Sequence, residues 1–424
     1  MLVDFQITNF RSFKGEQSFS LIATKDKTLA DLNTISTGIT SLPFLLRSSV
    51  IYGANASGKS NFIKALQYMR GVIIESASLN PNQTYNIQPF RLDKVSSKLP
   101  IKFEITFIID TVRYQYSFTL NNHRILHEYL LVYKSFKPQK WFNRYYEEDK
   151  NEDIYEFGPS LKGKKSLWEE STRPNALFLS MAVQLNSQQL RPIFDWFSEK
   201  LIIFNSLSPL SVNDSLEMLH NPADKKEICD FLKAADISIA DIQIQNKKII
   251  GKTIHFDLIG EKSEVKEEEQ EVAELQFHHI TEKGEAFLDL QDESDGTKRL
   301  LFMTGPVLKI LKQGKIVVVD ELDNSLHPLI VRRLIELFHD PNINQEGSQI
   351  VFSTHDVSLL DHELFRRDQI WFVEKNNDQE SSLYPLSDFS PRKGEAIAKG
   401  YLMGRYGALP LLNNWQISEV TRGT

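Results

Sequence analysis

The sequence predicts an α/β protein with a mostly parallel sheet, an antiparallel β region and a small helical insertion. The apolar run 49–52 passes through a glycine-containing loop into a helical pattern of apolar residues, which is the order strand, loop, helix. Apolar residues in 103–120 alternate with a period of two around a central turn, as in an antiparallel hairpin. Further on, apolar strands at 315–319 and 349–352 flank a helical stretch, an alternation typical of a parallel sheet.

The order of these patterns divides the chain into three segments. Residues 1–184 contain the first strand, the loop and helix, and the antiparallel region. From about residue 185 the apolar period changes to that of helices, so we expect 185–274 to be a helical insertion. Its end, with Glu267–Glu271, reads as a solvated acidic loop or arm. Residues 275–424 return to α/β character, and no heptad pattern persists long enough for a long coiled coil.

Composition narrows the class of protein. The 424 residues are 41% hydrophobic and 25% charged, as in ordinary globular proteins, so fibrous and wholly disordered classes are excluded. The single cysteine, Cys229, cannot form an internal disulfide and indicates a reducing, intracellular setting. No secretion signal and no run of 18 apolar residues is present, so we expect a cytoplasmic protein with no membrane contact.

The net charge of −7 does not exclude nucleic acid, because local patches govern such binding. One basic cluster contains two aromatic residues, and it is made of Lys134, Lys137, Lys140, Trp141, Phe142 and Arg144. Such a cluster is either a solvated face or a surface that holds phosphates and stacks bases. Both interpretations stay open, and DNA or RNA is retained as a partner.

The segment 53–60 reads G-A-N-A-S-G-K-S and fits the phosphate-loop pattern G-x-x-x-x-G-K-[ST]. The glycines let backbone N–H groups curl around phosphate oxygens, and the helix that follows adds its dipole. Lys59 is expected to reach the β- and γ-phosphates of ATP and to act in catalysis, and Ser60 to bind Mg²⁺. The residues expected to contact the nucleotide are Gly53, Asn55, Ala56, Ser57, Gly58, Lys59, Ser60 and Asn61.

A pair of acids follows the apolar strand 316–319. We expect Asp320 to hold the Mg²⁺ ion through its water shell and Glu321 to orient the attacking water, the arrangement that ATP hydrolysis requires. Alone, this pattern also fits a strand that ends in a helix-capping acid. The phosphate loop favours the catalytic interpretation.

Two further segments resemble, in order and spacing, the signature motif and the His-switch of ABC-type ATPases, which include the SMC, Rad50 and RecF heads. They are Ser294-Asp295-Gly296 and Ser353-Thr354-His355-Asp356. The resemblance implies an ABC-type ATPase head, in which Ser294 and Gly296 cap the γ-phosphate of an ATP held by another subunit. It also implies that His355 senses that phosphate, and hence a homo-oligomer that is at least dimeric. Structurally, the first segment also fits a helix cap and the second a histidine beside a strand end.

More of the chain is similar to the bacterial RloA-like ATPases of the AAA_15 and AAA_21 groups, which are linked to anti-phage defence. The residues that carry this similarity are 9–13, 320–328, 366–372 and 401–410. Two residues depart from the transporter pattern. Transporters usually have glycine at the position of Asp295, and their D-loops end in aspartate at the position of His327. These departures put transporter-like dimer coupling in doubt.

The resemblance also implies a Q-loop after the first helix. Gln88 is the preferred residue, Gln83 is the rival, and a surface glutamine without a role is an equal alternative. Arg11 either touches nucleotide or caps the first strand.

The expected function is an ATP-driven switch that controls a separate effector, such as a nuclease or toxin. The alternatives are a DNA-repair ATPase of the RecF and Rad50 kind that binds DNA directly, a transporter subunit, and a fused nuclease. The 69 residues after His355 are too few to hold a fused nuclease domain and complete the head.

Overall fold

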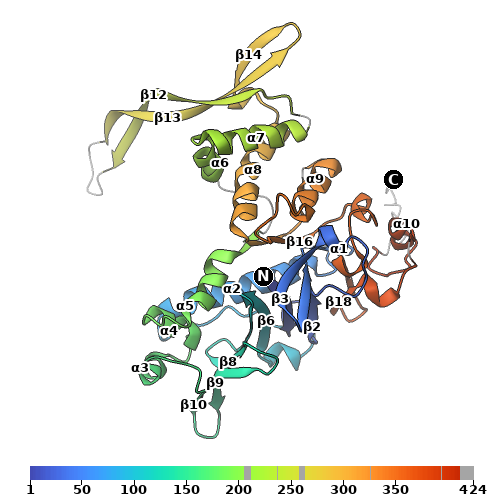
Figure 1. The fold of residues 1–424 in the computed structure, drawn as a ribbon. Coiled ribbons are helices and arrows are strands. Elements are labelled where there is room, and N and C mark those ends of the chain that lie inside the picture. Colours follow the sequence, from blue (N-terminus) through green and yellow to red (C-terminus); the bar gives the residue numbers. More distant parts are fainter. Residues whose placement is uncertain (205–211, 236, 257–262, 325, 393, 411–424) are drawn as a thin grey trace, which may run out of the picture. The chain divides into compact units, whose positions relative to one another are not determined.

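The computed structural model describes residues 1–204, 212–235, 237–256, 263–324, 326–392 and 394–410 (Figure 1). The chain forms two compact units. The first contains Met1–Ser206 and Gln313–Thr424, and the second contains Leu207–Lys312. Among the helices in the described ranges, none combines the length and apolar character that crossing a membrane requires.

A six-stranded sheet of order β11-β15-β16-β5-β17-β18 forms one layer of the first unit. All neighbours in it are parallel except β18, which is antiparallel to β17. Its central strands β5, β15 and β16 are buried along their whole length and mostly apolar, as expected for parallel strands covered on both faces. The strands are β5 (Ser48–Tyr52), β11 (Leu201–Phe204), β15 (Ile316–Val319), β16 (Gln349–Ser353), β17 (Ile370–Lys375) and β18 (Ser381–Pro385).

A seven-stranded antiparallel sheet of order β10-β9-β8-β7-β6-β1-β2 forms a second layer. The predicted hairpin in 103–120 is confirmed as β6 and β7, which are joined by a turn with Asp110 and Thr111 at positive φ. The mixed α/β class with an antiparallel subdomain is therefore as predicted. The strands are β1 (Leu2–Thr8), β2 (Gln17–Ser20), β6 (Ile101–Ile109), β7 (Val112–Leu120), β8 (Ile125–Tyr133), β9 (Gln139–Glu147) and β10 (Glu152–Phe157).

Helix α2 (Lys59–Glu75) joins the two sheets through one apolar core. The ring of Phe62 lies 5.7 Å from that of Phe5 on β1 and 5.1 Å from that of Phe19 on β2. Phe19 in turn lies 5.0 Å from Trp371 on β17. Because its buried face contacts both sheets, the start of α2 is held at the end of β5.

Smaller elements complete the first unit. They are α1 (Ala30–Asn33), β3 (Thr34–Ile39), β4 (Leu42–Leu46), α3 (Lys165–Ser171), α4 (Phe178–Gln184), α5 (Arg191–Asp195), α9 (Pro328–His339) and α10 (Ile397–Leu402). The predicted strands near 315 and 349 and the helix between them correspond to β15, β16 and α9.

The second unit contains two helices, a long hairpin with a third strand, and helix α8. Ser215 on α6 donates a hydrogen bond of 3.0 Å to the carbonyl oxygen of Leu301 on α8. The hairpin register pairs Lys252 with Glu267 and Lys248 with Glu271. The elements are α6 (Val212–Leu219), α7 (Pro222–Ala234), β12 (Asp241–Phe256), β13 (Ser263–Thr281), β14 (Gly284–Asp289) and α8 (Asp295–Gln313).

The structure corrects two details of the predicted insertion 185–274. Leu190, Ile193 and Phe197 have the helical period that sequence reasoning noted, but they are buried in the core of the first unit. The Glu-rich segment 267–271 lies in strand β13 and is not a loop. The second compact unit therefore begins later than predicted, extends through most of α8, and combines helices with strands.

Candidate functional site

The phosphate-loop segment 53–60, the pair Asp320 and Glu321, and His355 follow three neighbouring parallel strands. The segment 53–60 connects β5 to α2, the acids follow β15, and His355 follows β16, which lies between β15 and β5. The carboxyl ends of parallel strands open at one edge of a sheet, where ligands bind in such folds. The topology thus brings together residues that lie up to 302 positions apart in sequence, from Gly53 to His355.

The backbone of the loop requires glycine at two positions. A Cβ atom on Gly53 would lie 2.4 Å from the carbonyl oxygen of Val373. Gly58 has a φ of 124°, and its Cβ would lie 2.5 Å from the hydroxyl oxygen of Ser381. Gly58 is also the N-cap of α2, no side chain caps this end, and the first turn contains no acid. The N-terminus of α2 is therefore suited to an anion from outside the chain.

Lys59 is buried in the loop. Its ammonium group donates hydrogen bonds of 2.9 Å to the carbonyl oxygen of Gly53 and 3.2 Å to that of Ala54. Burial lowers the pKa of Lys59, and the charges of Asp320 and Glu321 oppose this shift. The cation thus lies inside the field of the carboxylates that follow β15.

Ser353 at the end of β16 holds the acid pair in place. Its hydroxyl donates a hydrogen bond of 2.6 Å to Asp320 Oδ1 and accepts one of 2.8 Å from the backbone N–H of Glu321. Asp320 is buried, whereas Glu321 is partly exposed and has a φ of 54°. This left-handed backbone turns the chain sharply after β15, so the two acids leave the strand in different environments.

His355 is exposed at the same edge. Its backbone N–H donates to Asp323 Oδ2 at 3.2 Å. Burial lowers the pKa of His355 and the charge of Lys59 lowers it further, while nearby carboxylates act in the opposite direction. The imidazole is therefore neutral near neutral pH and can donate or accept a hydrogen bond.

Two polar atoms near these residues fit an absent ligand. Ser57 Oγ and Asp323 Oδ1 are buried, and within the described residues neither has a hydrogen-bond partner. Buried polar atoms without partners are rare and are expected where a ligand or water completes the bonding. Together with the uncapped N-terminus of α2, they are consistent with a phosphate-containing ligand at this edge.

Ser294 and Gly296 lie in the second unit, at the start of α8. The Ser294 hydroxyl accepts a hydrogen bond of 3.1 Å from the backbone N–H of Thr297, the geometry of a helix N-cap. Ser294, Asp295 and Gly296 are all exposed. Ser294 thus caps α8, and the exposed turn is accessible to a further group.

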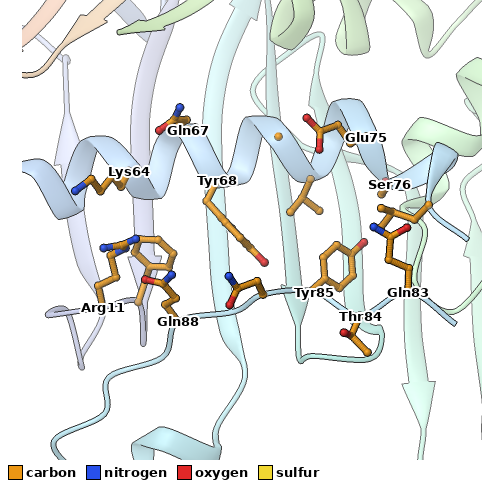
Figure 2. Close-up of a pocket in the computed structure, with 15 residues that line it drawn as sticks. Arg11, Lys64, Gln67, Tyr68, Glu75, Ser76, Gln83, Thr84, Tyr85 and Gln88 are labelled. Atoms are coloured by element: carbon orange, nitrogen blue, oxygen red, sulfur yellow. The ribbon is translucent and has the colours of Figure 1, made fainter. Parts of the chain in front are cut away.

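Gln88 and Gln83 lie near opposite ends of helix α2. Gln88 lines a cavity together with Asn61, in the first turn of α2, and with Arg11, whose backbone N–H donates to the Gln88 carbonyl oxygen at 2.7 Å. Figure 2 shows Gln83 beside the far end of α2, near Ser76. Asn61 itself donates a hydrogen bond of 2.8 Å to Ser12 Oγ. This placement favours Gln88 as the residue nearer to the phosphate loop.

The basic cluster at 134–144 is divided by the fold. Arg144 is buried and forms an ion pair of 3.0 Å with Asp153. Lys140 is paired with Glu156, and the rings of Trp141 and Phe142 are buried. These two rings are therefore not available for stacking with bases, which corrects one of the two interpretations of the sequence.

Sequence reasoning missed the positioning serines of the site. Ser381 on β18 donates a hydrogen bond to the carbonyl oxygen of Ser57, and Ser12 accepts from Asn61. Ser353 was noted only as part of the histidine motif. Spacing along the chain contains no signal for these contacts, because each partner comes from a distant strand or loop.

The fold and the site define a nucleotide-binding ATPase domain of the phosphate-loop class. The family model AAA_21, described as "AAA domain, putative AbiEii toxin, Type IV TA system", matches residues 48–361, and the chain belongs to this family. No curated protein matches the chain. A solved structure described as the SmcHead bound to the C-winged helix domain of ScpA is similar over 91% of this chain and 97% of its own, at 12% identity and a TM-score of 0.37, which is too low to bear on function.

Proposed function

We propose that the protein binds Mg²⁺-ATP and hydrolyses it, and that its nucleotide state controls a separate effector. The observation that supports hydrolysis is the meeting of Lys59, Glu321 and His355 at one edge of the parallel sheet. Phosphoryl transfer needs mainly positioning and charge stabilisation, and these groups supply both.

Each residue has a proposed role. The backbone of 53–60 and Lys59 hold the phosphates, and Ser60 and Asp320 hold the magnesium ion, which neutralises phosphate charge when bound. Glu321 orients the attacking water and accepts its proton, while neutral His355 contacts the γ-phosphate. Gln88 completes the site from the segment after α2.

The test uses two substitutions in the full chain. Lys59→Ala should weaken ATP binding at least tenfold, because the buried cation in the loop is lost. Glu321→Gln should keep ATP bound and reduce turnover by about a hundredfold or more, because binding and water activation use different groups. Binding is measured by calorimetry and turnover by phosphate release. Undiminished turnover in Glu321→Gln would contradict the proposed role of Glu321 in orienting the attacking water.

We further propose that ATP joins two copies through the turn at Ser294 and Gly296, and that the second unit transmits the result to an effector such as a nuclease or toxin. Exposure of this turn on a separate compact unit supports the proposal. The effector and the toxin that the family description names, of a type IV TA system, are of one kind, and anti-phage defence is part of this proposal. ATP can drive such output only by favouring the contacts of one conformation over another.

A second candidate function is direct binding of nucleic acid. A groove of about 530 Å³ gathers hairpin tips of the antiparallel sheet and is lined by Arg113, Lys134 and Phe136. The Arg113 guanidinium lies 3.9 Å from the centre of the Tyr133 ring, and Phe136 is 84% exposed. Cations beside an exposed ring suit phosphates and a stacked base. The test is binding of single-stranded DNA or RNA at several salt concentrations. Salt-sensitive binding would favour this function over the effector switch if Phe136→Ala and Lys134→Ala both weaken it.

A further inference from the structure

A second cavity lies beside α2, away from the phosphate loop. It has a volume of about 580 Å³ and separates the helix from the segment 79–88. Its helical wall is the stripe Lys64, Tyr68, Gly71 and Val72, whose spacing of three and four residues places the side chains on one face. None of residues 53–60 lines this cavity. Its size is typical of small-molecule sites.

One end of the cavity is positively charged. Figure 2 shows Lys64 and Arg11 near each other at the end closest to Gln88. Within the described residues, neither Lys64 nor Arg11 forms an ion pair, and Arg11 Nε is buried without a hydrogen-bond partner. The acid among the lining residues, Glu75, lies near the other end of α2 in Figure 2. A buried donor and two unpaired cations are suited to a phosphate group.

The middle of the cavity presents an aromatic wall and a free hydroxyl. The Tyr68 ring lies 5.8 Å from that of Phe10, and both residues line the cavity. Tyr68 Oη is buried and has no partner in the part of the chain that the structure describes. Amide side chains of Asn86 and Gln88 line the opposite wall. A flat heteroaromatic ring with polar edges would use all of these groups.

Gly71 keeps the cavity open. Apart from proline, glycine is the least favoured residue in a helix interior. In α8, Gly305 is explained by close packing, because its Cβ would lie 2.6 Å from Ser215 Cα. A Cβ on Gly71 has no heavy atom within 4 Å, so close packing does not explain the glycine there. The missing side chain leaves space in front of Tyr68 and Val72.

We propose that this cavity is a second nucleotide site, distinct from the ATP site, with a 5′-phosphate at Arg11 and Lys64 and a base against Tyr68. Inorganic phosphate alone would leave most of the volume and the Tyr68 hydroxyl unused. A free mononucleotide and the 5′-phosphorylated end of an oligonucleotide share this chemistry. Occupation would act on the ATP site through α2 and Gln88, which border both.

The test is made on the full chain carrying Lys59→Ala, so that binding at the phosphate loop is weakened and failure of the ATPase proposal is scored separately. AMP, GMP, a 5′-phosphorylated tetranucleotide and inorganic phosphate are titrated by calorimetry. We expect saturable binding of at least one of the three nucleotide probes, and the tighter of the mononucleotide and the tetranucleotide identifies the source. Inorganic phosphate should bind at least tenfold more weakly.

Substitutions at Gly71 distinguish a site from an empty space. Gly71→Leu fills the cavity and should weaken nucleotide binding at least tenfold, whereas Gly71→Ala should change it by less than threefold. Both favour the helix, so thermal unfolding should show that they fold. Lys64→Glu should weaken binding at least tenfold, and Tyr68→Phe should weaken it without loss of the aromatic wall. The proposal would be overturned by the absence of saturable binding up to about 1 mM, or by an unchanged affinity in Gly71→Leu. If inorganic phosphate bound as tightly as the nucleotides, the assignment of the ligand as a nucleotide would be wrong.

Discussion

Ser353 acts on both acids of the candidate site without being an acid or a base itself. Its single hydroxyl fixes one oxygen of Asp320 and the backbone of Glu321. Groups that orient metal-binding carboxylates typically contribute 10- to 100-fold to affinity or activity. The site therefore depends on a residue whose type alone predicts nothing.

We predict that Ser353→Ala lowers ATP turnover by about 10- to 100-fold and raises the Mg²⁺ concentration needed for half-maximal rate. Ser49→Ala is the matched control, because Ser49 is equally buried on the neighbouring strand β5 and donates a hydrogen bond of 2.9 Å to the Gln369 carbonyl oxygen instead. Phosphate-release assays over a Mg²⁺ series measure both. An equal effect of the two substitutions would show that both lower the ATP turnover only by destabilising the fold.

His339 makes the stability of the protein depend on pH. Ser48 Oγ accepts a hydrogen bond of 2.7 Å from Gln369 Nε2. The Ser48 hydroxyl can therefore donate its own proton to His339 Nε2, which lies 2.7 Å away and acts as the acceptor. Burial, followed by the charge of Arg47, lowers the pKa of His339 to about 3. In the unfolded chain the His339 imidazole becomes protonated near pH 6.5, whereas in the folded chain it stays neutral at that pH. The free energy of unfolding therefore decreases as the pH falls below about 6.5.

We predict that lowering the pH from about 7.5 to 5 costs about 2 kcal/mol of unfolding free energy through His339 alone. His339→Gln should remove this part of the pH dependence while other titrating groups remain. Urea unfolding of both proteins at the two pH values isolates the difference. Identical pH dependence in the two proteins would contradict the neutral, buried histidine.

The residues of the site divide into those that sequence spacing reveals and those that it does not. Lys59 and Ser60 are predictable because the loop and its helix are local, and Asp320 because it ends a buried strand. Ser353 and Asp323 are not, since their roles depend on which strand lies beside which. A parallel sheet places partners from distant segments side by side, and one sequence contains no record of that order.

At the scale of elements, α8 depends on glycine where it meets α6. A Cβ on Gly305 would lie 2.5 Å from Ser215 Oγ and 2.6 Å from Ser215 Cα. Because the obstacle includes backbone, the two helices must separate to admit a methyl group. The hydrogen bond from Ser215 to Leu301 would then be lost.

We predict that Gly305→Ala destabilises the second unit by about 1–3 kcal/mol, the usual cost of overpacking. Gly296→Ala in the same helix is the control, because its Cβ would have its nearest neighbour, Ser294 Oγ, at 3.7 Å. Hydrogen exchange followed by mass spectrometry should show faster exchange within 207–312 for the first substitution. Unchanged exchange there would mean that α6 and α8 do not pack as the structure shows.

Two elements were predicted incorrectly for physical reasons. Glu267–Glu271 has the composition of a solvated loop, but the backbone pairs across the hairpin with a strand that contains Lys248 and Lys252. The pairing depends on the partner strand, and the local composition of one segment cannot show it. The helical period near Leu190 was recognised correctly, whereas the place of these residues in the core of the first unit depends on tertiary contacts.

At the scale of the whole molecule, the proposed shared ATP site makes a quantitative prediction for mixed variants. We expect Lys59→Ala and Ser294→Arg to be inactive alone. In an equal mixture about half of the dimers are mixed, and each of these has one intact site, so about a quarter of the wild-type ATPase rate should return. Titrating one variant into the other and following phosphate release measures this. No recovery, while scattering shows mixed dimers, would exclude a shared site.

The strand order of the six-stranded sheet also governs how the molecule is made. β5 lies between β16 and β17, and the backbone N–H of Leu2 donates a 2.6 Å hydrogen bond to the side chain of Gln349. Roughly 300 residues separate β5 from these neighbours, so a ribosome that adds about 5–20 residues per second leaves it unpaired for about 15–60 s. The nascent chain therefore leaves β5 without its strand neighbours through most of its synthesis, while α2 can already pack on β1 and β2. The proposed ATP site can assemble only near the end of translation, because a chain interrupted before β16 lacks both strands that flank β5.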